Sequence, residues 1–174
     1  MGPVEIVVAC RAGRRLAPTC SRLLRRLLKE TRSAGRGVTL LLTSDAGIRR
    51  LNRLWLAKDG TTDVLSFPAR GDLEPGRPHL GDMAISVPQA QKQARRARWG
   101  LDDEMALLLT HGFLHLLGYD HETDDGEMRR LEEDLLRRAA GVQLRRRRLP
   151  WGEKRAAARK ARSRRPEVGG ERDR

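Results

Sequence analysis

The chain of 174 residues is long enough for one domain with a hydrophobic core, and its formal net charge of +13 points to a polyanionic partner. No apolar run reaches the roughly 20 residues of a membrane-spanning helix, and the run at residues 6–9 is too short for a signal peptide. Cys10 and Cys20 have neither zinc-like spacing nor a disulfide framework around them. We therefore expect a soluble, cytoplasmic protein that makes no contact with membranes.

Hydrophobic periodicity predicts four strands and five helices. In chain order they are a strand at 4–9, a helix at 19–33, a strand at 38–43, a helix at about 45–57, strands at 63–67 and 80–86, and helices at 88–99, 103–117 and 127–140. Segments 11–18 and 69–79 are predicted to be loops. This order indicates a single α+β domain over residues 1–141, a mixed sheet of about four strands packed with helices. We expect the third and fourth strands to pair antiparallel and the second to be central, but the full strand order stays open.

Two helices carry specific predictions about their ends and faces. Ser44 or Asp45 is expected to cap the second helix. Its predicted buried side consists of Ile48, Leu51, Leu54 and Trp55. Asp102 is expected to cap the fourth helix, which is apolar nearly all round and is therefore predicted to be buried.

Three of the four histidines lie in residues 111–121, His-Gly-Phe-Leu-His-Leu-Leu-Gly-Tyr-Asp-His. His111 and His115 are four residues apart, so they share one face of the buried helix. Gly118 can adopt the left-handed conformation that ends a helix, which lets the chain return and bring His121 to the same point. One histidine in an apolar helix is usually a core residue, but this arrangement predicts a metal site at the end of the helix.

Zinc is the expected ion, one per chain, because imidazole suits it, although nickel, copper and iron accept the same ligands. A structural zinc ion usually has four protein ligands that commonly include Cys. No Cys lies near these histidines, so an open, catalytic metal site is favoured. His79 is a candidate fourth ligand, but we expect this loop residue to be solvated.

The spacing His-x3-His-x2-Gly-x2-His is also the ligand spacing of metzincin proteases. Those enzymes carry Glu, their general base, directly after the first His. Gly112 occupies that position here and has no side chain. Peptidase activity is therefore not expected.

The C-terminal residues carry most of the charge. Residues 142–174 hold thirteen Lys or Arg against four Asp or Glu, a net charge of +9, which leaves +4 for residues 1–141. Like-charge blocks with few apolar residues are typical of disordered segments that bind nucleic acid. We predict a basic, disordered tail that contacts RNA without sequence preference; the alternative is a solvated tail that only aids solubility.

The sequence resembles the YbeY-type endoribonucleases, metal-dependent ribosomal RNA maturation factors of bacteria. Besides the histidine motif, the resemblance rests on residues 62–68 (Thr-Asp-Val-Leu-Ser-Phe-Pro), 80–86 (Leu-Gly-Asp-Met-Ala-Ile-Ser) and 51–52 (Leu-Asn). It implies a zinc ion on His111, His115 and His121 and a single-strand-specific endoribonuclease that acts in ribosomal RNA processing and ribosome biogenesis. The partners it implies are ribosomal RNA and ribosomal particles, with no specificity for DNA.

The catalytic groups stay open at this stage. Asp120, Glu122 and Asp124 are candidate helpers, and Asp120, beside a ligand, is favoured for orienting a histidine rather than for catalysis. Hydrolysis by water and attack by the ribose 2′-OH both fit a metal of this kind. Two other functions also remain, a non-catalytic, metal-containing ribosome assembly factor and a metallohydrolase that acts on another substrate.

One position departs from the family pattern. Similar proteins carry Arg in a Leu-Asn-x-x-aromatic-Arg sequence, and the corresponding residue here is Leu56. A guanidinium group near a metal-bound phosphate would form paired hydrogen bonds and stabilise developing charge. Arg53 and Lys58 are the nearby cations that could replace it. We predict a site that keeps its zinc but has lost part of its phosphate clamp.

Overall fold

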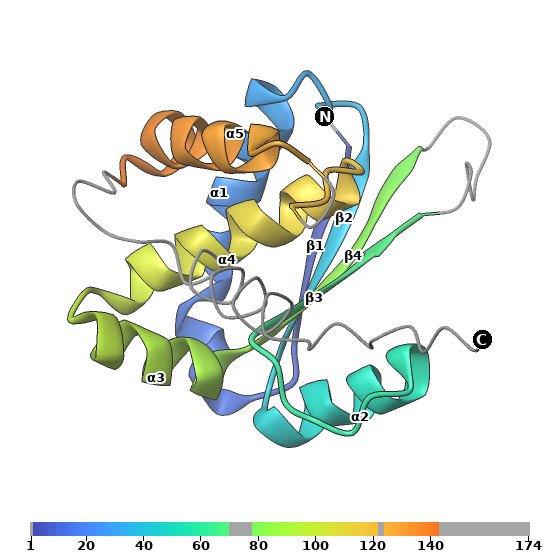
Figure 1. Cartoon of the computed structure of the whole chain (residues 1–174), viewed down its shortest axis with the longest axis vertical. Helices are drawn as coiled ribbons and strands as arrows, with labels where there is room; N and C mark the ends of the chain where they lie inside the picture. The colour runs from blue at the N-terminus through green and yellow to red at the C-terminus, as the bar shows by residue number, and fades with distance from the viewer. Residues whose placement is uncertain (1, 70–77, 122–123, 143–174) are drawn as a thin grey trace, which may run out of the picture. The chain divides into compact units, whose positions relative to one another are not determined.

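The computed structural model describes residues 2–69, 78–121 and 124–142, which form a single α+β domain with one four-stranded mixed sheet (Figure 1). The strands are β1 (Val4–Val8), β2 (Gly37–Thr43), β3 (Val64–Pro68) and β4 (His79–Ser86). The helices are α1 (Ala17–Glu30), α2 (Asp45–Leu56), α3 (Val87–Ala97), α4 (Leu101–Leu116) and α5 (Glu127–Leu135). The predicted fold class is confirmed. The predicted tail lies outside the described residues, except for Val142.

The strand order of the sheet is β1-β2-β4-β3. β1 pairs parallel with β2, and β2 pairs parallel with β4. β3 pairs antiparallel with β4, as predicted, and β2 has a neighbour on both sides, as its apolar sequence indicated. β4 thus fills the position between β2 and β3, although β3 comes first in the chain.

The alternation of side chains along β3 divides the helices between the two faces of the sheet. Leu65 packs with Ile48 of α2 in a buried cluster. Val64 and Ser66, which point the other way, lie 3.0 and 2.9 Å from the position that a Cβ atom on Gly112 of α4 would occupy. α2 therefore covers one face, and α4 lies on the other together with α1, α3 and α5 (Figure 1).

The prediction for α2 is confirmed at its start and wrong at its end. The Ser44 side chain caps the helix, and Ile48 is fully buried. Leu54 and Trp55, predicted to be buried, are 70 % and 65 % exposed. β3 is an edge strand, so in the described part of the chain no further strand covers the last turn of α2. The Trp55 ring instead lies beside Phe67, with ring centroids 6.1 Å apart.

Two helix starts also differ from the predictions. The segment expected to be a loop at residues 11–18 contains a 3-10 turn (Arg11–Arg15) and the start of α1, where Pro18 occupies a first-turn position that favours proline. α4 begins at Leu101 after Gly100, so Asp102 lies in the first turn instead of capping the helix. An acidic residue there still interacts favourably with the helix dipole.

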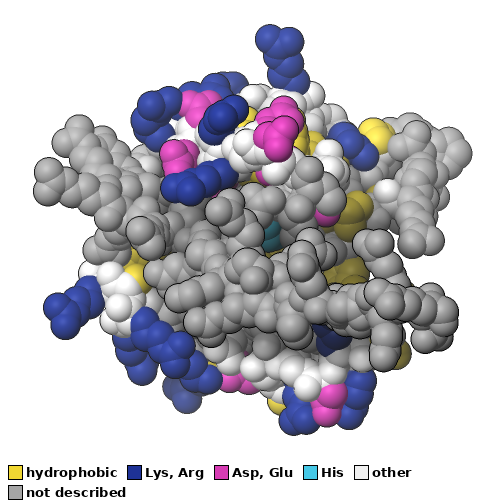
Figure 2. All heavy atoms as spheres, viewed as in Figure 1, with side chains coloured by type: hydrophobic (Ala, Val, Ile, Leu, Met, Phe, Trp, Pro, Cys, Tyr) yellow, Lys and Arg dark blue, Asp and Glu magenta, His cyan; other side chains and the backbone are white. Residues whose placement is uncertain are grey.

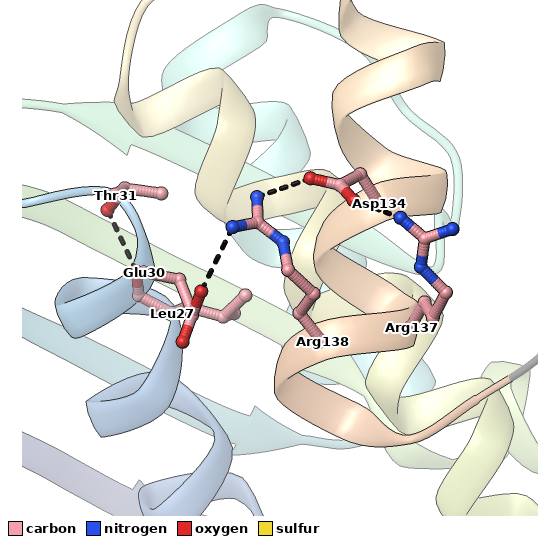
Figure 3. A network of polar contacts seen from close by, with 6 residues as sticks. All are labelled: Leu27, Glu30, Thr31, Asp134, Arg137 and Arg138. Carbon is pink, nitrogen blue, oxygen red and sulfur yellow. Dashed lines mark hydrogen bonds and ion pairs between the residues drawn. The ribbon is translucent and has the colours of Figure 1, made fainter.

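α5 continues into a π-helical turn (Leu136–Ala140) that is tied to the end of α1. Arg138 of this turn donates to Glu30 of α1 over 3.2 Å and also to Asp134 (Figure 3). Such exposed ion pairs contribute only about 0–1 kcal/mol each. Burial of Leu135 and Leu136, both 0 % exposed, contributes more and fixes α5 against the domain.

α4 is the most apolar helix but has only 16 residues. None of the helices in the described ranges has the length and hydropathy needed to cross a bilayer.

On the face shown in Figure 2, Lys and Arg side chains gather over α5 and α3 and outnumber the acidic ones.

Candidate metal centre

α4 places two of the three predicted ligands. Every residue from Glu104 to Leu114 is buried, so this helix forms the centre of the domain. Gly112 allows α4 to lie directly against the sheet, because a Cβ atom there would come within 2.9 Å of Met83 Sδ and Ser66 Oγ. The sheet thereby fixes the helix whose C-terminal turns carry His111, which is buried, and His115, which is half-buried.

The structure brings the three histidines together. Nε2 of His111 and Nε2 of His115 are 3.1 Å apart. The chain turns at Gly118, whose φ of 91° is left-handed as predicted. The His121 ring centroid then lies 5.2 Å from that of His111 and 5.3 Å from that of His115. One nitrogen from each ring lies within 4.8 Å of the others, so this group could hold a metal ion.

The donor set fits a zinc-like ion. Two nitrogens that bind one tetrahedral zinc ion at 2.0–2.1 Å are roughly 3.3 Å apart. The observed separation of 3.1 Å between the first two imidazoles is close to that value. The one-turn spacing on α4 therefore gives His111 and His115 the separation that a shared ion requires.

The environment also favours the protonation state that binds metals. Burial lowers the pKa of His115 below its ordinary value, and the neighbouring His111 and His121 lower it further. A hydrogen bond with the Tyr119 backbone raises the pKa of His115 and opposes these effects. The resulting preference is for a neutral imidazole, which is the form that offers a lone pair to a metal.

A buried carboxylate at this site was missed by the sequence analysis. Nδ1 of His111 lies 3.1 Å from Oε1 of Glu132 on α5, and the two side chains are 6 % and 2 % exposed. Burial raises the pKa of Glu132 to about 8, although His121 and His115 lower it. A signal was present in the sequence, because Glu132 lies four residues after Met128 and three before Leu135, on the apolar side of this amphipathic helix.

The acidic residues proposed as helpers have different positions. Asp124 lies just before α5, and its carboxylate accepts hydrogen bonds from the backbone N–H groups of Gly126 and Met128 over 2.8 and 2.7 Å. Asp120 is exposed. Glu122 lies outside the described residues. A catalytic base is therefore not assigned from these three.

His79 does not belong to the three-histidine group. It is the first residue of β4 rather than a loop residue, and its Nε2 lies 2.9 Å from Oδ1 of Asp82. Strand pairing opposite Gly37 leaves the ring half-buried instead of solvated. Within the described ranges, the cluster able to hold a metal consists of His111, His115 and His121.

Leu56 lies at the C-terminal end of α2 and is 47 % exposed. α2 and α4 pack on opposite faces of the sheet, and the last turn of α2 lies beside the edge strand β3, where Trp55 contacts Phe67. Arg53 and Lys58 are exposed on the same part of the molecule. The predicted loss of a phosphate clamp at Leu56 stays a prediction.

Comparison with known proteins places these features in a family. The sequence model of the endoribonuclease YbeY family matches residues 11–140. An endoribonuclease YbeY from Thermus thermophilus is 41 % identical over 139 residues, which cover 76 % of this chain and 98 % of that protein. One from Myxococcus xanthus is 47 % identical over 138 residues, which cover 76 % of this chain but only 47 % of that protein.

A solved structure shows the same fold. The solution structure of TM1509 from Thermotoga maritima superposes with a TM-score of 0.58 at 24 % sequence identity, covering 97 % of this chain and 99 % of that one. The family match includes β2, β3, β4 and the histidine cluster, and the resemblance seen in the sequence is confirmed. The chain belongs to the endoribonuclease YbeY family.

Proposed function

We propose that this protein is a zinc-dependent endoribonuclease that cleaves single-stranded segments of ribosomal RNA during ribosome maturation. The observation that carries the proposal is the convergence of His111, His115 and His121 at the end of the buried helix α4. Three protein ligands are typical of catalytic zinc sites, whereas structural sites usually have four. The relatives named as endoribonucleases support RNA as the substrate.

The residues of the chain would prepare the site for this reaction. Burial keeps the His115 imidazole neutral and available as a ligand, and α4 holds it on the same helix face as His111. When bound, zinc supplies Lewis-acid chemistry and makes water a stronger nucleophile near neutral pH.

The proposed partners are ribosomal RNA and ribosomal particles in the cytoplasm. The net charge of +13 favours a polyanion, and cations outnumber acids on the face seen in Figure 2. We propose that residues 1–141 form the catalytic domain and that residues 142–174 add sequence-independent RNA contacts.

The test is cleavage of ribosomal RNA fragments by the purified full chain. We expect cleavage that a chelator abolishes and that added zinc restores, with single-stranded RNA cut faster than a duplex of the same sequence. RNA binding without cleavage in the zinc-loaded protein would instead support an assembly factor. Cleavage of small esters or peptides, but not RNA, would support a hydrolase that acts on another substrate.

Removal of residues 142–174 should weaken RNA binding and leave a folded domain that binds zinc. The deleted segment has a net charge of +9, so fewer counterions are released when the shortened protein binds RNA. The measurement is the dissociation constant for RNA at several salt concentrations. An unchanged slope of log affinity against log salt would show that the tail makes no RNA contact.

Leu56→Arg should increase RNA cleavage or RNA affinity without changing the zinc content. The added guanidinium group can form paired hydrogen bonds with phosphate, which Leu cannot. Leu56 is 47 % exposed, so the substitution does not disturb the core. Unchanged cleavage in this variant, together with inactive Arg53→Ala protein, would assign the clamp to Arg53. No effect of either change would refute the clamp.

A further inference from the structure

Glu132 is an ionisable residue in a buried position. It lies on the inner side of α5 and is 2 % exposed, between Met128 at 1 % and Leu135 at 0 %. Acidic residues are almost never buried to this degree unless they are paired, because removing a carboxylate from water is costly. The position therefore needs an explanation in terms of a specific partner.

The partner is the first histidine of the metal centre. Oε1 of Glu132 lies 3.1 Å from Nδ1 of His111, and the His111 side chain is itself 6 % exposed. The other ring nitrogen of His111, Nε2, lies 3.1 Å from Nε2 of His115. The two nitrogens of one ring thus have separate partners, a carboxylate on α5 and the histidine cluster on α4.

We propose that Glu132 is a positioning residue for the metal centre, which accepts a hydrogen bond from Nδ1–H of His111 and so keeps Nε2 unprotonated and directed at the ion. This inference rests on the proposed metal-binding function. In neutral imidazole one nitrogen carries the proton and the other has the free lone pair, so a hydrogen-bond acceptor at Nδ1 selects the tautomer that binds metal through Nε2. The carboxyl oxygen also orients the ring, because it accepts this hydrogen bond in either protonation state of Glu132.

α5 is well suited to this task because it is anchored independently of the histidines. Its side chains Met128 and Leu135 are buried, and Arg138 ties its continuation to Glu30 of α1 (Figure 3). The sequence separation between the two partners is 21 residues, so the contact depends on how α5 crosses α4. Loss of the carboxylate should therefore change the metal centre while the helix remains packed.

The test compares Glu132→Gln with Glu133→Gln in the full chain. Glu133 is the adjacent residue on α5, its side chain is 47 % exposed, and it pairs with Arg129 on the same helix. Gln has the size of Glu but no charge, and its amide can donate to Nδ1 and select the wrong tautomer. We expect Glu132→Gln to weaken zinc binding about 10–100-fold, measured by competition with a chromophoric chelator, and Glu133→Gln to leave it within about twofold.

Two further measurements separate positioning from general stability. The visible absorption spectrum of the cobalt-substituted protein reports ligand geometry, and it should change in Glu132→Gln but not in Glu133→Gln. In the zinc-loaded protein without substitutions, proton–nitrogen NMR should show the His111 proton on Nδ1, a result that does not depend on any variant folding.

The outcomes distinguish this inference from the proposed function. Equal zinc affinity and equal cobalt spectra in both variants would overturn the role of Glu132 and leave the three-histidine site intact. A His111 proton on Nε2 in the zinc-loaded protein would also overturn it. If the protein without substitutions binds no zinc, the metal centre itself is wrong, and the role of Glu132 falls with it.

Discussion

His121→Ala should reduce the zinc content from about one ion per chain to almost none and abolish RNA cleavage. His121 supplies one of only three imidazoles in the cluster, and the remaining pair on α4 would hold the ion with two ligands. The metal content of protein purified without added zinc, measured by mass spectrometry, tests this directly. Full zinc occupancy in the His121→Ala protein would refute the three-ligand site.

The same substitution should remove the stabilisation that zinc provides. At free zinc 100 times above its dissociation constant, binding to the folded state contributes about 2.7 kcal/mol to the free energy of unfolding. For a chain of 174 residues this corresponds to a rise in Tm of about 5–10 °C. We expect that rise in the unsubstituted protein and its loss in His121→Ala.

His79→Ala is the matched control for both measurements. It removes the fourth histidine of the chain, which lies on β4 and pairs with Asp82 instead of joining the cluster. The variant should keep its zinc and its zinc-dependent rise in Tm. Loss of zinc from this protein would place His79 in the metal centre.

Gly112→Glu, which would supply the residue that metzincin proteases carry after their first histidine, should prevent folding instead of creating a protease. Gly112 lies in the buried centre of α4, against β3 and β4. A Cβ atom there would be 2.9 Å from Met83 Sδ and Ser66 Oγ, so a longer, charged side chain has no space. Circular dichroism of the purified variant should show loss of the native structure.

Gly112→Ala should also destabilise the protein, but less than Gly112→Glu. Overpacking costs about 1–3 kcal/mol, and the better helix propensity of Ala offsets about 1 kcal/mol of it. Ser66 Oγ, which donates to the Gly112 carbonyl over 3.0 Å, would also have to move. Loss of that hydrogen bond adds about 1 kcal/mol, so we expect the free energy of unfolding in urea to fall by about 1–3 kcal/mol.

Gly60→Ala is the control for the glycine substitutions. Nothing lies within 4 Å of a Cβ atom at Gly60, so the free energy of unfolding of the Gly60→Ala protein should change by less than about 1 kcal/mol. If Gly112→Ala were as stable as Gly60→Ala, α4 would not be packed against β3 as the structure shows.

Much of the histidine cluster could be predicted because its information is local. His111 and His115 are one helical turn apart, and Gly118 follows at the point where α4 has ended. These relations follow from the geometry of one helix and one turn, which short-range sequence patterns describe. The same reason explains why the order of the strands and α-helices in the described part of the chain was predicted correctly, although the 3-10 turn at Arg11–Arg15 was not.

The last turn of α2 shows where periodicity fails. Ile48 and Trp55 lie on one apolar stripe, but Ile48 is buried over the sheet and Trp55 is 65 % exposed. Periodicity states which side of a helix is apolar, and the extent of the sheet beneath it decides how much of that side is covered. Because β3 is the edge strand, the apolar stripe continues past the surface that could bury it.

The sequence by itself determined the α+β class, the antiparallel pairing of β3 with β4, and the histidines that meet at the end of α4. Only the tertiary structure decided the strand order and the contact between Glu132 and His111. The physical reason is the sequence separation over which each interaction acts. Helical and strand periodicity act over a few residues, whereas β4 enters the sheet, and α5 crosses α4, through packing between segments that are distant in the chain.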